Sequence, residues 1–328
     1  MFDYGKISYF KIDDGNFGEH SLNRFDFCQK VEKCWRKKDG RYILTAVNYT
    51  DDRNLSERKQ TALKILKRVN SGSVAVAAES EGDIIGFALI DTRLFGSERQ
   101  YADLSEFYIS APFRRLGIGR KLFDRVCRAA KTSGAKKLYI SAHSAKESIA
   151  AYKSYGCVLA AEPDGKHIMQ EPCDLQLEYD LSPRIYKAVN KDDYKSLLLL
   201  ADEQWSMVER YLDNSDTFII EDCGVKGEIT VTDVGNGILE IKNLAVYPQF
   251  KRLGYGKKLI DFISEKYKDA FSILQAGTGD SPLTVPFYEK CGFTRARVVK
   301  HFFTENYDLP IIEAGVVLDD MIYLTKKL

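Results

Sequence analysis

The sequence predicts two α/β domains in tandem. First, a chain of 328 residues is long for one compact domain and suits two domains of roughly 150 residues each. Second, 45% hydrophobic and 29% charged residues is ordinary usage for chains with a packed core. Third, one glycine-punctuated segment occurs twice, as RRLGIG at residues 114–119 and as KRLGYG at residues 251–256. A duplicated domain accounts for all three observations.

The repeat extends beyond the two glycine segments. At a lag of about 137 residues, the pairs that match are Asp103 and Glu240, Phe113 and Phe250, Arg115 and Arg252, Leu116 and Leu253, Gly117 and Gly254, Gly119 and Gly256, Lys121 and Lys258, Leu122 and Leu259, and Asp124 and Asp261. Further along, Tyr152 and Tyr288 match at a lag one residue shorter. Pro183 lies between two strand-like runs and cannot donate a ladder hydrogen bond, which favours a short linker there. We therefore expect domains at residues 1–182 and 183–328.

Hydrophobic periodicity predicts three strands followed by a helix in both copies. In the first copy we expect strands at 73–79, 84–91, 102–109, 138–142 and 174–179, with helices at 117–133 and 146–154. In the second copy we expect strands at 184–189, 217–221, 228–232 and 239–246, with a helix at 254–267. The turn at Glu81, Gly82 and Asp83 predicts a hairpin. Upstream, residues 42–49 alternate like a strand and residues 56–69 resemble a helix.

A Gly-x-Gly turn between a strand and a helix is a physical solution for holding phosphate. The helix N-terminus offers unpaired N–H groups and a partial positive charge, and glycine lets the backbone approach the anion. Cations flank both turns: Arg114, Arg115, Arg120 and Lys121 in the first, and Lys251, Arg252, Lys257 and Lys258 in the second. A tight turn needed only for packing, beside a solvated basic helix face, would leave the same pattern.

These residues resemble the GNAT superfamily of acetyltransferases, whose acyl-CoA signature is Gln/Arg-x-x-Gly-x-Gly/Ala after a strand. The first copy matches fully, whereas the second has Lys251 in place of Gln or Arg. The resemblance implies two tandem folds, each a mixed, mostly antiparallel central β-sheet flanked by helices, with acetyl-CoA as co-substrate. It also implies a tyrosine before an aromatic-Gly-Phe ending, which Tyr288 and its neighbours fit and which Tyr152 fits with Cys157 in place of Phe.

The resemblance further implies which residues hold acetyl-CoA. The strand ends would hold pantetheine through their backbone, and the turns would hold pyrophosphate. The predicted cofactor-binding residues are Phe107, Tyr108, Ile109, Arg114, Arg115, Leu116, Gly117, Ile118, Gly119 and Arg120 in the first copy, and Leu244, Ala245, Val246, Lys251, Arg252, Leu253, Gly254, Tyr255, Gly256 and Lys257 in the second.

Amide formation requires a base and an acid. The amine must lose a proton before it attacks the thioester, and the departing thiolate must gain one. Asp103 and Glu240 stand where many GNAT enzymes place the base, and Glu106 competes for this role in the first copy. Tyr152 and Tyr288 are the candidate acids. Each carboxylate could instead be a polar residue on a solvated strand face, and each tyrosine could be an aromatic packed between helix and sheet.

Composition argues against other classes of protein. A formal net charge of +1 provides no overall field for nucleic acid or a membrane surface, so neither partner is expected. The seven cysteines form no Cys-x-x-Cys pair, and the four histidines are isolated in sequence, so no metal site is predicted. The N-terminal residues are polar and acidic where a secretory signal would be basic and then apolar. We therefore expect a cytoplasmic protein.

The acceptor is predicted from acidic residues near the end of each copy: Glu162, Asp164, Glu171 and Asp174 in the first, and Glu305, Asp308, Glu313, Asp319 and Asp320 in the second. If they line acceptor clefts, a small cationic amine of the polyamine or amino-sugar antibiotic type would be attracted. Solvated loops would give the same composition. A protein or peptide amine as acceptor, and one domain acting only as a structural or CoA-binding module, are the alternatives. The sequence does not indicate an oligomeric state.

Overall fold

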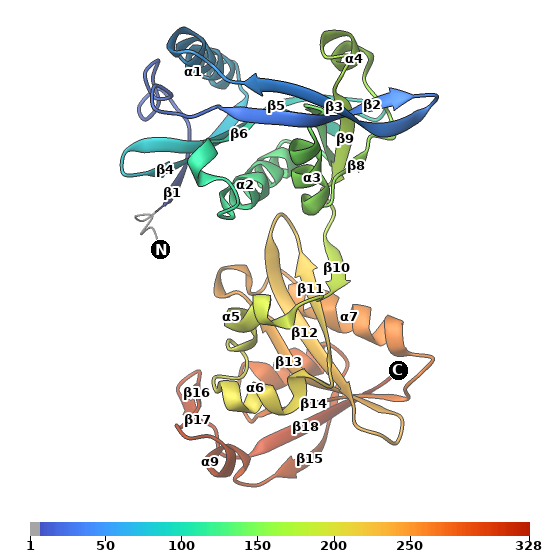
Figure 1. Cartoon of the computed structure of the whole chain (residues 1–328). Coiled ribbons are helices and arrows are strands. Elements are labelled where there is room, and N and C mark those ends of the chain that lie inside the picture. The colour runs from blue at the N-terminus through green and yellow to red at the C-terminus, as the bar shows by residue number, and fades with distance from the viewer. Residues whose placement is uncertain (1–6) are drawn as a thin grey trace. The chain divides into compact units, whose positions relative to one another are not determined.

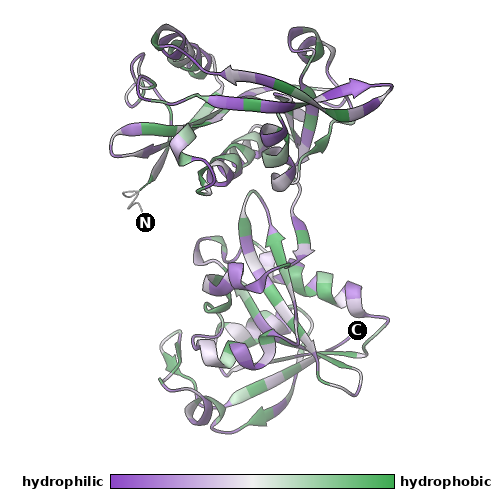
Figure 2. Cartoon of the chain, viewed as in Figure 1, coloured by the Kyte–Doolittle hydropathy of each residue, from purple (hydrophilic) through white to green (hydrophobic). Residues whose placement is uncertain are grey.

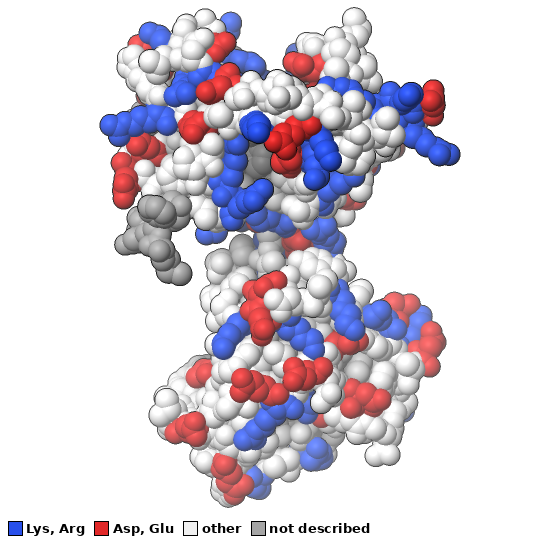
Figure 3. Space-filling view, viewed as in Figure 1, with Lys and Arg blue, Asp and Glu red and all other residues white. Residues whose placement is uncertain are grey.

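A computed structural model describes residues 7–328 of the chain (Figure 1). Contacts between residues divide the chain into two compact units, of which the first ends at Ser182 and the second begins at Pro183. Each unit has a hydrophobic core of its own. Lys and Arg side chains are interspersed with Asp and Glu on the face of each unit shown in Figure 3, in keeping with the small net charge.

The first unit is built on a seven-stranded sheet with the order β1-β4-β5-β6-β7-β9-β8. Its strands are β1 (Ser8–Lys11), β4 (Val74–Ser80), β5 (Asp83–Phe95), β6 (Tyr101–Ile109), β7 (Lys137–Ala142), β8 (Val158–Leu159) and β9 (Leu175–Asp180). Neighbouring strands are antiparallel except β6 and β7, which are parallel. The mixed, mostly antiparallel sheet implied by the resemblance is confirmed.

Helices cover both faces of this sheet. They are α1 (Leu55–Asn70), α2 (Ile118–Thr132), α3 (Lys146–Tyr155) and α4 (Gly165–Gln170). The α1 helix begins at a capping box, in which Asn54 and Glu57 each accept a hydrogen bond from the other's backbone N–H. It packs on the face of β5 that presents Phe87. The α2 helix packs on the opposite face, where Gly86 has no side chain and a Cβ would come within 2.9 Å of Leu122.

A β-hairpin outside this sheet departs from the predicted order of the first copy. The strand predicted at 42–49 exists as β3 (Arg41–Asp51), but its partner is β2 (Gln29–Lys38), which the sequence did not predict. Asp39 and Gly40 make the turn with positive φ at both positions, as a two-residue hairpin turn requires. The hairpin packs on the segment after β7, where Trp35 donates a backbone hydrogen bond to Ser144.

The second unit repeats the strand order of the first, as β10-β11-β12-β13-β14-β18-β15. These strands are β10 (Arg184–Lys187), β11 (Asp216–Glu221), β12 (Val225–Asp233), β13 (Ile238–Val246), β14 (Ile273–Gly279), β15 (Thr294–Val299) and β18 (Met321–Lys327). Again a single neighbouring pair, β13 and β14, is parallel. The duplication predicted from the sequence is therefore confirmed at the level of topology.

The helices of the second unit are α5 (Lys195–Leu198), α6 (Trp205–Leu212), α7 (Tyr255–Tyr267), α8 (Thr284–Lys290) and α9 (Phe302–Asn306), and a small hairpin pairs β16 (Ile312–Glu313) with β17 (Val316–Val317). The α7 helix buries Leu259, Ile260 and Ile263 against the sheet. Figure 2 shows hydrophobic colouring along the middle strands of this unit, where the core lies. Among residues 7–328, no helix is both long and apolar enough to cross a bilayer.

Candidate active site

Both sheets split at their single parallel strand pair. In the first unit β6 pairs with β7 only from Tyr101 to Asp103, although β6 continues to Ile109. In the second unit β13 pairs with β14 only from Ile238 to Ile241, although β13 continues to Val246. Past these points the two strands separate, which leaves backbone N–H and C=O groups of β6 and β13 free to bind an extended ligand. The predicted pantetheine residues, 107–109 and 244–246, lie along these separated stretches.

The two glycine turns follow the split strands and adopt the same backbone. Gly117 and Gly254 are the N-caps of α2 and α7, with φ of 78° and 83°. Arg115 and Arg252, two residues earlier, have positive φ of 64° and 65°, which is uncommon for residues with a Cβ. No side chain caps either helix, so backbone N–H groups at both N-termini can meet an anion.

The second glycine of each turn serves packing. A Cβ at Gly119 would lie 2.6 Å from the Tyr155 hydroxyl, and one at Gly256 would lie 3.1 Å from the Phe287 ring. At Gly117 and Gly254 a Cβ would meet nothing within 4 Å. The first glycine is therefore needed for its conformation, and the second for close approach of a ring.

The predicted cations lie in different surroundings. The Arg114 guanidinium turns inward and donates to the backbone carbonyls of Ile109, Cys28 and Phe27, at 3.0, 2.9 and 3.4 Å. Arg120 and Lys257 each pair with a carboxylate one helical turn on, at 3.1 and 2.7 Å. The remaining predicted side chains divide by burial. Ile118 and Tyr255 are buried, whereas the exposed ones are Arg115, Leu116, Lys251, Arg252 and Leu253.

Arg114 thus positions the first turn instead of offering its charge to solvent. We expect Arg114→Lys to lower the free energy of unfolding of the first unit by about 1–3 kcal/mol, because an ammonium cannot reach three carbonyls in a planar fork. Urea unfolding followed by Trp35 fluorescence, in a Trp205→Phe background, would measure this. The matched change Lys251→Arg in the second unit should have little effect. Equal stability of Arg114→Lys and the parent would show that these hydrogen bonds contribute nothing.

The two candidate acids occupy equivalent places beside the splits. Tyr152 extends from α3 and packs near Phe107 of β6, with ring centroids 5.9 Å apart. Tyr288 of α8 is buried between Phe287 and Phe293. Burial is the main cause that raises the pKa of both hydroxyls above the usual value, so both remain protonated at neutral pH.

The two candidate bases lie where the strands begin to separate. The Asp103 carboxylate is 3.4 Å from Nε2 of His167 on α4, and this contact is the main cause of a raised His167 pKa. The other ring nitrogen of His167 is 2.7 Å from Asp164. Glu240 forms an ion pair of 2.6 Å with Lys242 and accepts from Gln275 at 2.8 Å. Asp103 therefore already contacts the imidazole of His167, and Glu240 already contacts the ammonium group of Lys242.

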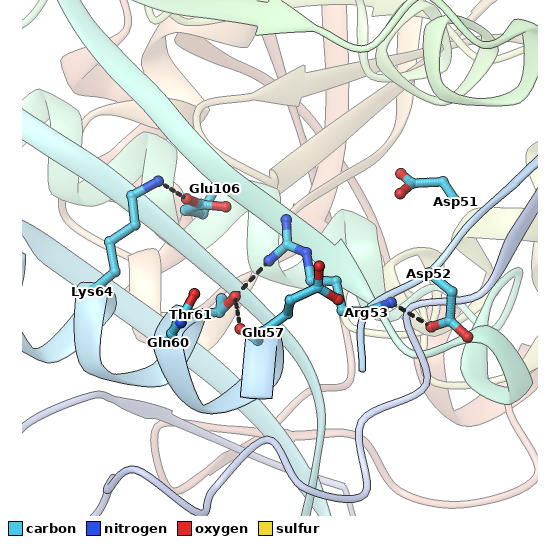
Figure 4. A pocket seen from close by; sticks show the side chains of 8 residues that line it. All are labelled: Asp51, Asp52, Arg53, Glu57, Gln60, Thr61, Lys64 and Glu106. Atoms are coloured by element: carbon cyan, nitrogen blue, oxygen red, sulfur yellow. Dashed lines mark hydrogen bonds and ion pairs between the residues drawn. The ribbon is translucent and has the colours of Figure 1, made fainter. Parts of the chain in front are cut away.

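An acidic pocket of about 380 Å³ opens on the α1 side of the first unit, beside β6 (Figure 4). Its lining residues are Asp51, Asp52, Arg53, Glu57, Gln60, Thr61, Lys64 and Glu106. Four are carboxylates and two are cations. Glu106, the competitor base, is 7% exposed and pairs with Lys64 at 2.7 Å. The pocket combines the end of β3, the first turns of α1 and β6, and only Glu106 among these residues was singled out from the sequence.

Several histidines that are isolated in sequence acquire partners in the fold. His143 lies 3.0 Å from the Tyr49 hydroxyl, and its Nδ1 atom is buried without a hydrogen-bond partner among residues 7–328. Donor atoms of His301, Asp319 and Asp320 lie within 4.8 Å of one another. These three groups already bond to each other and to Lys300, so the cluster does not require an ion.

The sequence does not distinguish two further candidates: Asp174 is one of several acidic residues near the end of the first copy, and Glu228 lies in a predicted strand. Asp174 stands just before β9, and burial raises the pKa of its carboxyl to about 6. Glu228 on β12 is fully buried; its carboxyl accepts from the Thr230 hydroxyl at 2.8 Å and the Ala245 N–H at 3.1 Å. Burial raises the pKa of Glu228 to about 8. Their surroundings are set by strand register, which a single sequence does not show.

Known proteins resemble both halves of the chain. The acetyltransferase (GNAT) family profile matches residues 34–157, and a second acetyltransferase (GNAT) domain profile matches residues 213–295. The uncharacterized N-acetyltransferase YvbK of Bacillus subtilis (strain 168) is 31% identical over 136 residues, which cover 40% of this chain and 88% of that protein.

Solved structures with similarity include an IAA acetyltransferase from Bacillus cereus ATCC 14579, with 33% identity, a TM-score of 0.43, and coverage of 45% of this chain and 100% of that one. A GNAT family acetyltransferase from Elizabethkingia anophelis with acetyl-CoA bound has 31% identity, a TM-score of 0.43, and coverage of 44% and 98%. On the two profile matches and the curated relative, the chain belongs to the GNAT family of acetyltransferases, enzymes that take their acetyl group from acetyl-CoA, and carries two such domains in tandem.

Proposed function

We propose that the first unit transfers the acetyl group of acetyl-CoA to a primary amine of a small cationic molecule, of the polyamine or amino-sugar type. The observation that carries this proposal is the acidic pocket in Figure 4, because it adjoins β6 on the face opposite α2. A ligand that follows the glycine turn into the split would arrive from the α2 side. An amine arriving from the α1 side would meet carboxylates before it met the thioester.

The split, the turn and the tyrosine then have separate roles in the proposed reaction. Backbone groups of residues 107–109 hold the pantetheine arm, and the α2 N-terminus with Gly117 holds pyrophosphate. Tyr152 provides the proton that the departing sulfur requires. In the second unit, residues 244–246, Gly254 and Tyr288 would take the same roles.

A panel of amines tests the acceptor class. We expect thiol release from acetyl-CoA with diamines, polyamines or amino sugars, and much slower release with neutral-chain monoamines and with peptide N-termini. Asp51→Asn should raise the KM for a dicationic acceptor roughly three- to tenfold, with a smaller change in kcat, since it removes one charge from the pocket. Asp39→Asn, at the hairpin tip outside the pocket, is the charge-matched control. Transfer confined to peptides, read by mass spectrometry, would instead support the protein-directed alternative.

A further inference from the structure

The geometry points to Asp174 as the carboxylate that removes the proton from the acceptor amine in the first unit. This assignment rests on the proposed function. It replaces neither Tyr152 as the acid nor the α2 turn as the phosphate site, but it moves the base from the closed end of the split, at Asp103, to the open end.

The position of Asp174 follows from strand pairing. Its neighbour Leu175 begins β9 and pairs with Ala142, the last residue of β7. Asp174 therefore stands at the open end of the split, on the arm formed by β7 and β9. Asp103 belongs to the last pair before β6 and β7 separate, six residues before the end of β6. If the α2 turn holds the pyrophosphate, the pantetheine arm runs inward along residues 107–109, so the thioester lies within the split, beside the β7–β9 arm whose end carries Asp174.

Asp174 acts electrostatically on one side chain of β6 and on one side chain of α3. Burial is the main cause that raises the pKa of Tyr108, on β6, and of Tyr152, on α3, and the Asp174 carboxylate contributes to both shifts. Asp174 thus acts on the hydroxyl that would protonate the departing sulfur. Asp103, by contrast, is engaged by His167, and Glu106 by Lys64.

The surroundings of Asp174 leave it ready to accept a proton near neutral pH. Burial raises its pKa, and Glu171 after α4 adds to the rise. The groups that lower the pKa are His143 after β7, Ser141 on β7 and Arg36 on β2. The resulting pKa of about 6 makes Asp174 ionised at pH 7 yet more basic than an ordinary carboxylate. The nearby Nδ1 atom of His143, buried without a partner among the described residues, marks a polar group that an acceptor or a water would satisfy.

The second unit lacks this arrangement. When the two sheets are aligned on their parallel strand pair, Met321 takes the position of Asp174. Gly279 takes the position of His143, and Leu318 would lie against any side chain added there. The strand position that carries the Asp174 carboxylate in the first unit therefore carries an apolar side chain in the second.

The proton balance of the step is complete. An ammonium acceptor gives one proton to the Asp174 carboxylate, which passes it to water. The nitrogen lone pair then forms the bond to the thioester carbon, and the carbon–sulfur bond breaks with its electron pair on sulfur. Tyr152 gives its proton to that sulfur, and the second proton leaving the nitrogen restores Tyr152. The products are the amide, the free thiol and one proton.

The test is the pH dependence of transfer in a Gly254→Asp background, which disables the second phosphate turn. We expect Asp174→Asn to lower kcat on the order of 100-fold and to abolish the loss of rate below about pH 6, with acetyl-CoA affinity unchanged. Asp174→Glu should keep that acidic limb and recover part of the rate. Asp103→Asn and Glu106→Gln should keep the limb in place, whatever their effect on rate.

Calorimetric acetyl-CoA binding separates a catalytic effect from misfolding. If Asp174→Asn binds acetyl-CoA poorly, two other measurements test the assignment: the pH–rate profile of Asp174→Glu, and the titration of the Asp174 carboxyl in the parent, followed by ¹³C NMR. The assignment is overturned if the Asp174 carboxyl does not titrate over the pH range in which the rate falls. A limb that survives in a folded Asp174→Asn, or disappears in Asp103→Asn or Glu106→Gln, also overturns it while leaving the proposed function intact. A parent enzyme that transfers acetyl to no amine overturns both.

Discussion

Gly117→Asp should lower the affinity of the first unit for acetyl-CoA by about 100-fold or more, and Gly254→Asp should do the same in the second unit. Each places a carboxylate at a helix N-terminus, where it competes with and repels the pyrophosphate. A hundredfold loss corresponds to about 2.7 kcal/mol of binding free energy. Calorimetric titration would show the stoichiometry fall from two sites to one in each variant, and to none when both are combined.

The structure provides a control for these two variants. Gly117 and Gly254 have positive φ, and a Cβ at either would meet nothing within 4 Å. Asn tolerates this conformation nearly as well as any residue with a side chain, and it has the size of Asp without the charge. Gly117→Asn and Gly254→Asn should therefore retain most of the affinity. Wild-type binding by both Asp variants would show that the turns do not hold phosphate, and loss in one alone would show that a single unit binds acetyl-CoA.

The elements that the sequence predicts well are those set by local pattern. Hydrophobic periodicity locates β6 and β7 around the first split, β13 but not β14 around the second, and the helices α2 and α7. The glycine spacing locates turns whose backbones coincide in the two units. The β2–β3 hairpin is missed because β2 is charge-rich and pairs outside the main sheet. Its pattern resembles a solvated segment until the partner strand is known.

The site is predicted less completely, because its chemistry depends on register. Arg114 fits the sequence signature for a phosphate turn, yet its guanidinium is used on backbone carbonyls. Asp174 belongs to an acidic cluster that could equally be solvated, and only the pairing of β7 with β9 places it at the open end of the split. Glu228 is one strand residue among others until the structure shows that no solvent reaches it.

Glu228→Gln should stabilise the second unit at alkaline pH. The folded pKa of Glu228, about 8, lies well above the unfolded value of about 4.3. The folded state therefore holds a proton that the unfolded state releases between these values. The contribution of Glu228 to stability is fully present below about pH 4.3, declines as the pH rises above that value, and is lost once the pH has passed about 8. Glutamine is uncharged at every pH and can still accept from the Ala245 N–H, so it removes this loss.

We expect the variant and the parent to be similarly stable at pH 5, and the variant to be more stable by on the order of 2–4 kcal/mol at pH 8.5. Urea unfolding followed by Trp205 fluorescence, in a Trp35→Phe background, reports on the second unit alone. Glu240→Gln is the matched control: that carboxylate is also buried but pairs with Lys242, so its loss should destabilise the unit. If Glu228→Gln instead costs stability equally at both pH values, Glu228 is ionised in the folded state.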